Sequence, residues 1–480
     1  MKIAVQGCCH GALDAVYTHI RSLETRHNYK VGLLLMCGDF QAVRNQSDLL
    51  CMAVPQKYRQ LGDFWRYYTG EKTAPVLTIV IGGNHEASNY FWELYHGGWL
   101  APNIYFLGHA GCVQVDGLRI AGASGIYKSH DFRLGHHERM PYDHSSMRSI
   151  YHIREYNIRR LSLLSSPDVF LSHDWPCAIE QHGDLRGLLR RKPFFRGDIE
   201  SGRLGSPPLM GLLMTLRPEW WFAAHLHVKF EGVFRHESRT RLWEATQKEA
   251  NPDEIEIDFD DENPSTVVAQ DTVPNPSESA VHSGTDFSDV APTSPAPIPT
   301  QQINRSETRF LALDKCLPRR DFLEVLDIPT PLDFPSHSSE TASSPLSTSS
   351  HAENPSPRLM YDPEWLAITR AFDEYFSRSQ HQASFPDEET AKSRVTQEVD
   401  WVRKNLVQKH TGTEEGTGEV SGTTRGLAIS EHQAFVRTAP GPGSEGQGRG
   451  GGQPTPYTNP QTVAFCKMLG IEDRISPHPV

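Results

Sequence analysis

No apolar run in the 480-residue sequence approaches the roughly 20 residues that a membrane-spanning helix needs. The first residues follow an apolar strand pattern, so the sequence also lacks the basic, apolar and small-residue order of a secretory signal. Its eight cysteines have no spacing typical of a disulfide scaffold. We therefore expect an intracellular protein with reduced cysteines and no membrane partner.

Positively charged residues are fewer than negatively charged ones: the chain has 47 Lys and Arg against 59 Asp and Glu, which gives a net charge of -12. The deficit lies in one half of the chain: residues 1–250 hold 29 Lys and Arg against 24 Asp and Glu, whereas residues 251–480 hold 18 against 35. A mildly basic first half suits an anionic substrate such as a phosphodiester. Much of 251–358 and 409–460 consists of Pro, Ser, Gly, Thr and acidic residues, and such a composition buries too little apolar surface to offset chain entropy.

Five apolar stretches end in side chains that can bind a metal. The stretches begin at residues 3, 33, 77, 168 and 220, and the side chains at their ends are Cys8 and His10, Asp39, Asn84 to Glu86, His173, and His225 with His227. Each taken alone is more often a turn, a helix cap or a satisfied polar residue. In an open α/β sheet, however, ligands collect at the carboxyl ends of the strands. The ordered set therefore predicts one metal site.

The ordered set resembles the calcineurin-like metallophosphoesterases, whose pattern is Asp-x-His, Gly-Asp, Gly-Asn-His-Glu, a lone His and Gly-His-x-His. Two positions differ, because Cys8 stands where that superfamily usually has Asp, and Ala224 where it usually has Gly. A Cys at the first position, followed by Cys-His-Gly, is similar to the lariat RNA debranching enzymes. So are the stretches GGNHEASNY, GGWLAPNIY, IYKSHD, LSHDWP and AHLHVKF, which begin at Gly82, Gly97, Ile126, Leu171 and Ala224.

The resemblance and the β-α-β-α-β order of the first 86 residues imply an α/β fold: a metallophosphoesterase β-sandwich flanked by helices, with a small helical C-terminal unit and disordered segments. We predict a catalytic domain at 1–236, a disordered acidic insert at 237–305, strands that complete the catalytic domain at 306–329, a linker at 330–358, a helical unit at 359–408 and a mostly disordered tail at 409–480.

Local patterns predict several smaller elements. Asp116-Gly117 predicts a type I′ hairpin, and residues 145–164 follow the period of one helix. Asp362-Pro363 predicts a helix start. Residues 461–471 are either a short docking motif or without a role, and we favour the latter.

The resemblance also implies the roles of the site residues. His85 would be catalytic, as a donor to the phosphate or to the leaving 2′-oxygen, and Glu86 would orient a histidine or cap the next helix. Asp39 would bridge two metals. One metal would be held by Cys8, His10 and His227, and the other by Asn84, His173 and His225. Because a thiolate favours softer ions, the expected cofactors are one or two divalent ions among Fe(II), Zn(II) and Mn(II).

Two segments are candidates for contact with RNA. Residues 127–142 have no periodicity and mix aromatic with basic residues, which fits either a surface loop or a nucleic-acid contact. In the debranching enzymes this position carries a loop that recognises branched RNA, which favours contact through Tyr127, Lys128, His130, Phe132, Arg133 and Tyr142. Residues 186–196 (RGLLRRKPFFR) also mix Arg with Phe and are the second candidate.

The resemblance implies a hydrolase that cuts the 2′,5′-phosphodiester at the branch point of excised intron lariats and converts them to linear RNA for turnover. Such a substrate implies the nucleus, with shuttling to the cytoplasm left open. It also implies splicing or RNA-turnover proteins as partners for the disordered segments. One alternative is a general metallophosphoesterase acting as a phosphatase or nuclease, against which Cys8 and the 127–142 segment argue. The other is a non-catalytic scaffold, against which the full ligand set and His85 argue.

Overall fold

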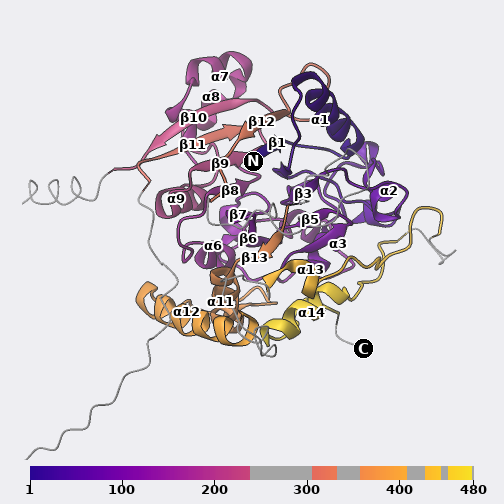
Figure 1. Ribbon diagram of the computed structural model, residues 1–480, viewed down its shortest axis with the longest axis vertical. Coiled ribbons are helices and arrows are strands. Elements are labelled where there is room, and N and C mark those ends of the chain that lie inside the picture. The colour runs from indigo at the N-terminus through magenta and orange to yellow at the C-terminus, as the bar shows by residue number, and fades with distance from the viewer. Residues whose placement is uncertain (238–304, 332–356, 408–426, 445–451, 478–480) are drawn as a thin grey trace, which may run out of the picture. The chain divides into compact units, whose positions relative to one another are not determined.

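The computed structural model describes residues 1–237, 305–331, 357–407, 427–444 and 452–477 (Figure 1). Residues 1–236 and the described residues from 305 onward form one compact unit built on two mixed β-sheets with helices on their outer faces. The α/β sandwich expected from the sequence is therefore confirmed. The predicted insert and linker lie largely outside the described residues. Residues 427–444 and 452–477 of the predicted tail are described, however, and belong to the compact unit, so these parts of the tail are not disordered. Within those residues, no helix has both the length and the apolar character needed to cross a bilayer.

The first sheet has the order β12-β1-β2-β3-β5-β4. Its parallel centre is β1 (Lys2–Gln6), β2 (Leu33–Met36), β3 (Leu77–Val80) and β5 (Ile104–Phe106). Antiparallel strands form its edges, namely β4 (Gly98–Ala101) beside β5 and β12 (Leu323–Asp327) beside β1. The carboxyl ends of β1, β2 and β3 consequently lie side by side at one edge of the sheet.

The second sheet has the order β10-β11-β9-β8-β7-β6-β13. Its parallel centre is β7 (Leu118–Ala123), β8 (Val169–Ser172), β9 (Trp220–Ala223) and β11 (Glu307–Ala312). The antiparallel members are β6 (Ala110–Val115), β10 (Phe230–Arg235) and β13 (Leu359–Tyr361). The segment at 306–329 supplies one strand to each sheet, β11 here and β12 in the first.

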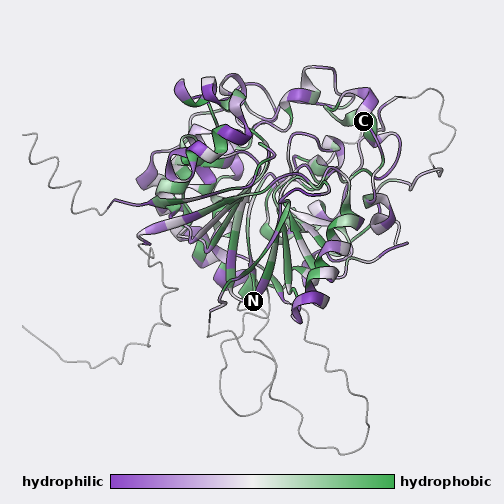
Figure 2. Ribbon diagram, turned by 90° about the horizontal axis from the view of Figure 1, so that it is seen from above, coloured by the Kyte–Doolittle hydropathy of each residue, from purple (hydrophilic) through white to green (hydrophobic). Residues whose placement is uncertain are grey.

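Successive side chains of a strand point to opposite faces of its sheet, and this alternation divides the apolar residues between two clusters. Ile3 and Val5 belong to the cluster between the two sheets, whereas Ala4 belongs to a second cluster that also contains Val16 and Tyr17 of α1 (Leu13–His27). Both faces of the first sheet are thus covered, which explains why its strands are apolar throughout rather than alternating. Figure 2 shows the strands at the centre of the molecule coloured largely as hydrophobic.

Short helices occupy the connections and outer faces. The N-terminal half contains α2 (Phe64–Tyr68), α3 (Ser88–Glu93), α4 (Ser129–Phe132), α5 (Ser146–Ser149) and α6 (Glu155–Leu161). These are followed by α7 (Leu185–Arg191), α8 (Arg196–Glu200) and α9 (Pro207–Leu216). The C-terminal part contributes α11 (Pro363–Ala371), α12 (Glu388–Val402), α13 (Ile429–His432) and α14 (Pro460–Leu469).

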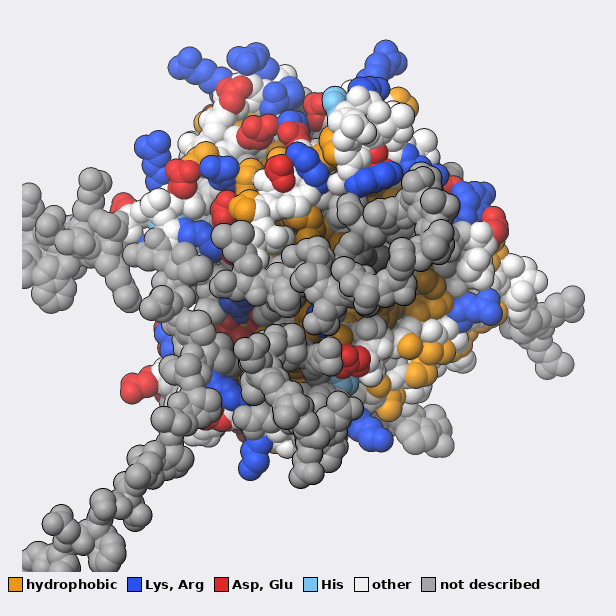
Figure 3. Space-filling model, in the orientation of Figure 1, with side chains coloured by type: hydrophobic (Ala, Val, Ile, Leu, Met, Phe, Trp, Pro, Cys, Tyr) orange, Lys and Arg blue, Asp and Glu red, His pale blue; other side chains and the backbone are white. Residues whose placement is uncertain are grey.

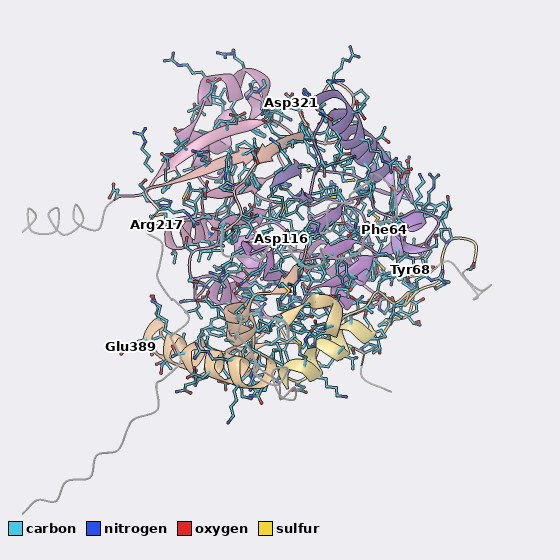
Figure 4. All side chains as sticks on the ribbon, viewed as in Figure 1. Phe64, Tyr68, Asp116, Arg217, Asp321 and Glu389 are labelled. Carbon is cyan, nitrogen blue, oxygen red and sulfur yellow. The ribbon has the colours of Figure 1, made fainter. Side chains whose placement is uncertain are left out.

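The prediction of one helix across 145–164 is wrong, because the chain leaves the helical path between α5 and α6. His152 forms a bridge with Ile126, and the Ile153 N–H donates to the Ile126 carbonyl at 2.9 Å. These bonds use backbone groups that a continuous helix would have paired internally. The hairpin is confirmed: Asp116 (Figure 4) and Gly117 have φ values of 47° and 82°, and both central residues of a type I′ turn need positive φ.

The C-terminal segments are anchored on the sheets by polar contacts. Asp362 accepts a hydrogen bond from the Trp365 N–H, which confirms the predicted helix start, and it also accepts two bonds from Arg119 on β7, at 2.8 and 3.0 Å. The interpretation of 461–471 as a segment without a role is wrong. Gln461 of α14 bonds both backbone groups of Trp99 on β4, at 2.7 and 2.9 Å, so α14 docks on the edge of the first sheet.

Candidate metal centre

The predicted ligands meet where the strands of the two sheets end. Cys8, His10, Asp39, Asn84, His173, His225 and His227 follow β1, β2, β3, β8 and β9 within a few residues. Four of them, His10, Asp39, His225 and His227, have φ between 45° and 61°. This left-handed backbone is unusual for residues other than glycine, and such strain gathers at functional sites.

One group of donors could hold a single ion. The ligand atoms of Cys8, His10, Asp39 and His227 all lie within 4.8 Å of one another. The Nε2 atoms of His10 and His227 are only 3.1 Å apart. Burial lowers the pKa of both imidazoles, that of His227 to about 3, so each ring stays neutral and keeps a lone pair. Two nitrogens, one sulfur and one carboxylate form a donor set that fits a divalent transition metal.

A second group surrounds the Nε2 atom of His173. It lies 3.1 Å from Asn84 Oδ1, 3.3 Å from His225 Nδ1 and 3.4 Å from Asp39 Oδ1. The other ring nitrogen of His173 lies 2.8 Å from the carbonyl of Cys37, so an N–H there donates to that carbonyl. This bond fixes the ring and directs Nε2 toward the other donors, which is the usual arrangement around a metal-ligating histidine. Burial lowers the pKa of His173, but the charge of Asp39 and the hydrogen bonds to Asp39 and Cys37 raise it above its ordinary value.

Asp39 links the two groups. Its Oδ1 faces His173, whereas its Oδ2 lies 3.8 Å from His10 Nε2. The side chain is buried, which raises its pKa, but the surrounding His173, His85 and His10 hold that pKa well below its usual range. Asp39 is therefore an ionised carboxylate with one oxygen toward each donor group, as a bridging ligand requires.

Glu86 has a role that the sequence interpretation missed. It neither orients a histidine nor caps α3. Its Oε1 accepts from the backbone N–H groups of Phe40 at 2.7 Å and Gly83 at 3.0 Å, and its Oε2 accepts from Gln41 at 2.7 Å. Burial raises the pKa of Glu86 to about 7, while these three donors favour its charged form. Glu86 thus clamps the turn that carries Asp39.

His85 lies at the accessible side of Asp39. Its backbone N–H donates to Asp39 Oδ1 at 2.9 Å, and its Nδ1 lies 3.5 Å from Asp39 Oδ2. A third of its side chain is exposed, whereas that of His173 is fully buried. His85 is therefore held beside both donor groups while its imidazole remains open to a bound substrate.

The candidate recognition loop is only partly exposed. Lys128, His130 and Arg133 face solvent, and the rings of Tyr127 and Phe132 contact each other at 5.6 Å, edge to face. His152 Nδ1 forms a hydrogen bond with the Oδ2 atom of Asp131 in this loop, at 2.5 Å. Tyr142 is separate: it is 5% exposed and belongs to an apolar cluster with Cys51 and Ile150, so its ring is not free to stack on a base.

Tyr151 is a further residue that the sequence interpretation missed. It lines a small cavity together with Gly83 and Glu86, the residues on either side of Asn84 and His85 in the sequence. Burial raises the pKa of Tyr151, the charge of Arg148 lowers it, and the charge of Asp39 raises it by a smaller amount. No sequence signal marked it, because residue 151 was placed inside a continuous helix that the structure does not contain.

Comparison with known proteins agrees with this geometry. Residues 1–229 match the family model described as calcineurin-like phosphoesterase, and residues 305–474 match the model of the lariat debranching enzyme C-terminal domain. The lariat debranching enzyme of Schizosaccharomyces pombe is 39% identical over 504 residues, covering 100% of this chain and 98% of that protein. The chain belongs to the lariat debranching enzyme family.

Other lariat debranching enzymes are similarly close. That of Drosophila melanogaster is 42% identical over 478 residues, covering 98% of this chain and 78% of that protein. The human enzyme is 40% identical over 475 residues, covering 98% of this chain and 70% of its own length. The family's C-terminal model covers β11, β12, β13 and the helices α11 to α14, so the strands added to both sheets and the docked helical segments lie within the part of the chain that this model matches.

Proposed function

We propose that this protein is a debranching hydrolase that cleaves the 2′,5′-phosphodiester at the branch point of lariat RNA. Membership of the lariat debranching enzyme family supports this substrate. The observation that carries the chemistry is the carboxylate of Asp39 between two donor groups, with His85 on its accessible side. A divalent metal bound at such a site neutralises phosphate charge and lowers the pKa of water.

The residues of the chain then have distinct tasks in the hydrolysis. Asp39 holds the two donor groups at a fixed separation, and Glu86 fixes the backbone turn on which Asp39 sits. Water adds to phosphorus while the bond from phosphorus to the 2′-oxygen breaks, and the proton that the water loses passes to solvent. The imidazole of His85 gives its proton to that leaving oxygen, so a free 2′-hydroxyl and a linear RNA result.

We propose Fe(II), Zn(II) or Mn(II) as the working metal, with the thiolate of Cys8 favouring the first two. Cys8 is fully buried, and burial raises the pKa of its thiol well above the usual value. Its Sγ accepts a hydrogen bond from the His225 N–H at 3.3 Å. A cysteine in this environment binds metal as a thiolate only when the ion replaces the proton, which hard ions such as Mg(II) achieve poorly.

The same proposal extends to cell location and partners. Intron lariats arise from splicing, so we propose a nuclear protein whose segments outside the described residues bind splicing or RNA-turnover factors. Imaging of the tagged full-length chain in cells tests the location. Exclusion of the tagged protein from the nucleus would contradict it.

The decisive experiment compares two RNAs of the same sequence, one with a synthetic 2′,5′ branch and one linear. Purified, reduced protein is supplied with each metal in turn. We expect selective cleavage of the 2′,5′ bond, and loss of that cleavage in the Asp39→Asn and His85→Ala variants. Equal cutting of both RNAs would indicate a general phosphodiesterase, and no cutting with any metal would favour a scaffold.

A further inference from the structure

A basic surface lies beside the metal centre and has no part in the chemistry described above. It consists of residues 186–196 and 315–320, which we call the basic ridge. Within 184–203 and 314–321, nine Lys and Arg stand against five Asp and Glu, in a chain whose net charge is -12. Figure 3 shows Lys and Arg side chains projecting over α7 and α8 at the top of the molecule, and Figure 4 places Asp321, which follows the second segment, between α1 and this region.

Both segments of the ridge connect directly to the metal ligands. Arg191, at the end of α7, donates to the carbonyl of Lys229 at 3.1 Å, and Lys229 is two residues beyond His227. In the second segment, Lys315 forms a backbone bridge with Cys8, and the Cys316 N–H donates to the Cys8 carbonyl at 2.9 Å. The ridge is therefore continuous with the rim of the metal centre.

The two segments flank the same group of ligands, because Arg191 bonds the backbone two residues after His227 and Lys315 pairs with Cys8. Among the described residues, Lys192, Lys315 and Arg319 form no ion pair with a carboxylate. Several cations held together without matching anions create a local positive potential that attracts a polyanion.

The ridge exposes an aromatic ring among these cations. Phe194 is 70% exposed, more than any other large hydrophobic side chain in the described part of the protein. The ring of the buried Phe195 lies 4.7 Å away, edge to face, and the Lys192 ammonium lies 5.8 Å from the centre of the Phe194 ring. Leu317 of the second segment is 43% exposed. A fixed, exposed ring beside Lys and Arg is the arrangement that proteins use to bind single-stranded nucleic acid, with a base on the ring and phosphates on the cations.

We propose that the basic ridge binds one single-stranded arm of the branched RNA, with Phe194 stacking on a base and Lys192, Lys315 and Arg319 contacting its phosphates. This inference rests on the proposed function, since it concerns the same substrate. A branch point carries three RNA arms, so a substrate seated at the metal centre must send its arms outward over the rim. On the ridge, cations without a carboxylate partner and an exposed ring lie together on one surface.

The test compares branched RNAs that share one branch point but carry short or extended arms. Each arm is extended separately, and the dissociation constant is measured by fluorescence anisotropy in an Asp39→Asn background, which prevents turnover. For the arm that lies on the ridge, Phe194→Ala should weaken binding of the extended RNA by about 5- to 150-fold, as expected for loss of one stacked base. Lys192→Gln should reduce the slope of log affinity against log salt by about 0.7.

Lys392→Gln on α12 is the matched control, because Lys392 is exposed and lies on a helix far along the chain from the ridge. It should leave binding of every RNA unchanged. The proposal is overturned if Phe194→Ala binds extended and short RNAs like the control, or if it weakens both equally, as a folding defect would. Cleavage of the short RNA by the wild-type protein is measured beside these. Its failure would refute the proposed function, whereas the binding comparison decides the ridge separately.

Discussion

Replacement of Glu86 by Gln tests the claim that this residue holds the turn of Asp39. Glutamine keeps the shape of the side chain but has one acceptor oxygen in place of two. If that oxygen takes the position of Oε1, Phe40 and Gly83 remain bonded, but the Gln41 N–H faces an amide NH2 group. The variant therefore loses one bond to a charged acceptor and leaves a buried donor unpaired. We expect the free energy of unfolding to fall by about 1.5 to 3 kcal/mol.

Glu86→Gln should also weaken metal binding. Asp39 sits at a φ of 45°, and its carboxylate is aimed by the backbone that Glu86 clamps. Changes to the groups that orient a metal ligand typically lower metal affinity by about 10- to 100-fold. We therefore expect Glu86→Gln to bind metal more weakly by that amount and to need more metal for full activity.

Two assays separate these effects. Denaturant unfolding of the metal-free protein measures the change in the free energy of unfolding that the lost hydrogen bond causes. Titration with metal measures the affinity of the site, which depends on the orientation of the Asp39 carboxylate. Glu71→Gln is the control, because half of the Glu71 side chain is exposed and its contact with Arg66 is long, at 3.8 Å. The reasoning is refuted if Glu86→Gln unfolds at the same denaturant concentration as this control and binds metal as tightly as the wild type.

Three further predictions concern other contacts. Asp362→Asn should destabilise the protein by about 3 kcal/mol, because it breaks the buried pair with Arg119. Burial raises the pKa of Asp362, but Arg119 lowers it below its ordinary value. The stabilisation by this pair is therefore present above about pH 4 and is lost as the pH falls further. The free energies of unfolding of wild type and variant should accordingly converge at low pH. Gln461→Ala should cost about 1 to 3 kcal/mol and speed hydrogen exchange at the Trp99 amide, and unchanged exchange would argue against docking of α14. Cys8→Asp should shift the metal that supports cleavage toward Mn(II) or Mg(II), and an unaltered metal preference would argue against Cys8 as a ligand.

The sequence was most informative where the determinant is local. Apolar runs that end in Cys8, Asp39, His173 and the His225 pair predict strands followed by metal-binding groups, because a strand and the turn after it are specified within about ten residues. The Asp116-Gly117 hairpin and the cap at Asp362 follow from the same short-range chemistry. The order of these motifs along the chain was also enough to indicate the family.

Tertiary structure alone decided the features that depend on distant residues. Glu86 finds its partners at Phe40 and Gln41, more than forty positions earlier in the sequence. The interruption between α5 and α6 results from pairing of His152 with Ile126, and the docking of Gln461 on Trp99 joins residues 362 positions apart. Periodicity and propensity record only what a segment prefers by itself. A backbone group that finds a stronger partner elsewhere in the fold can override that preference, and the partner is visible only once the chain has folded.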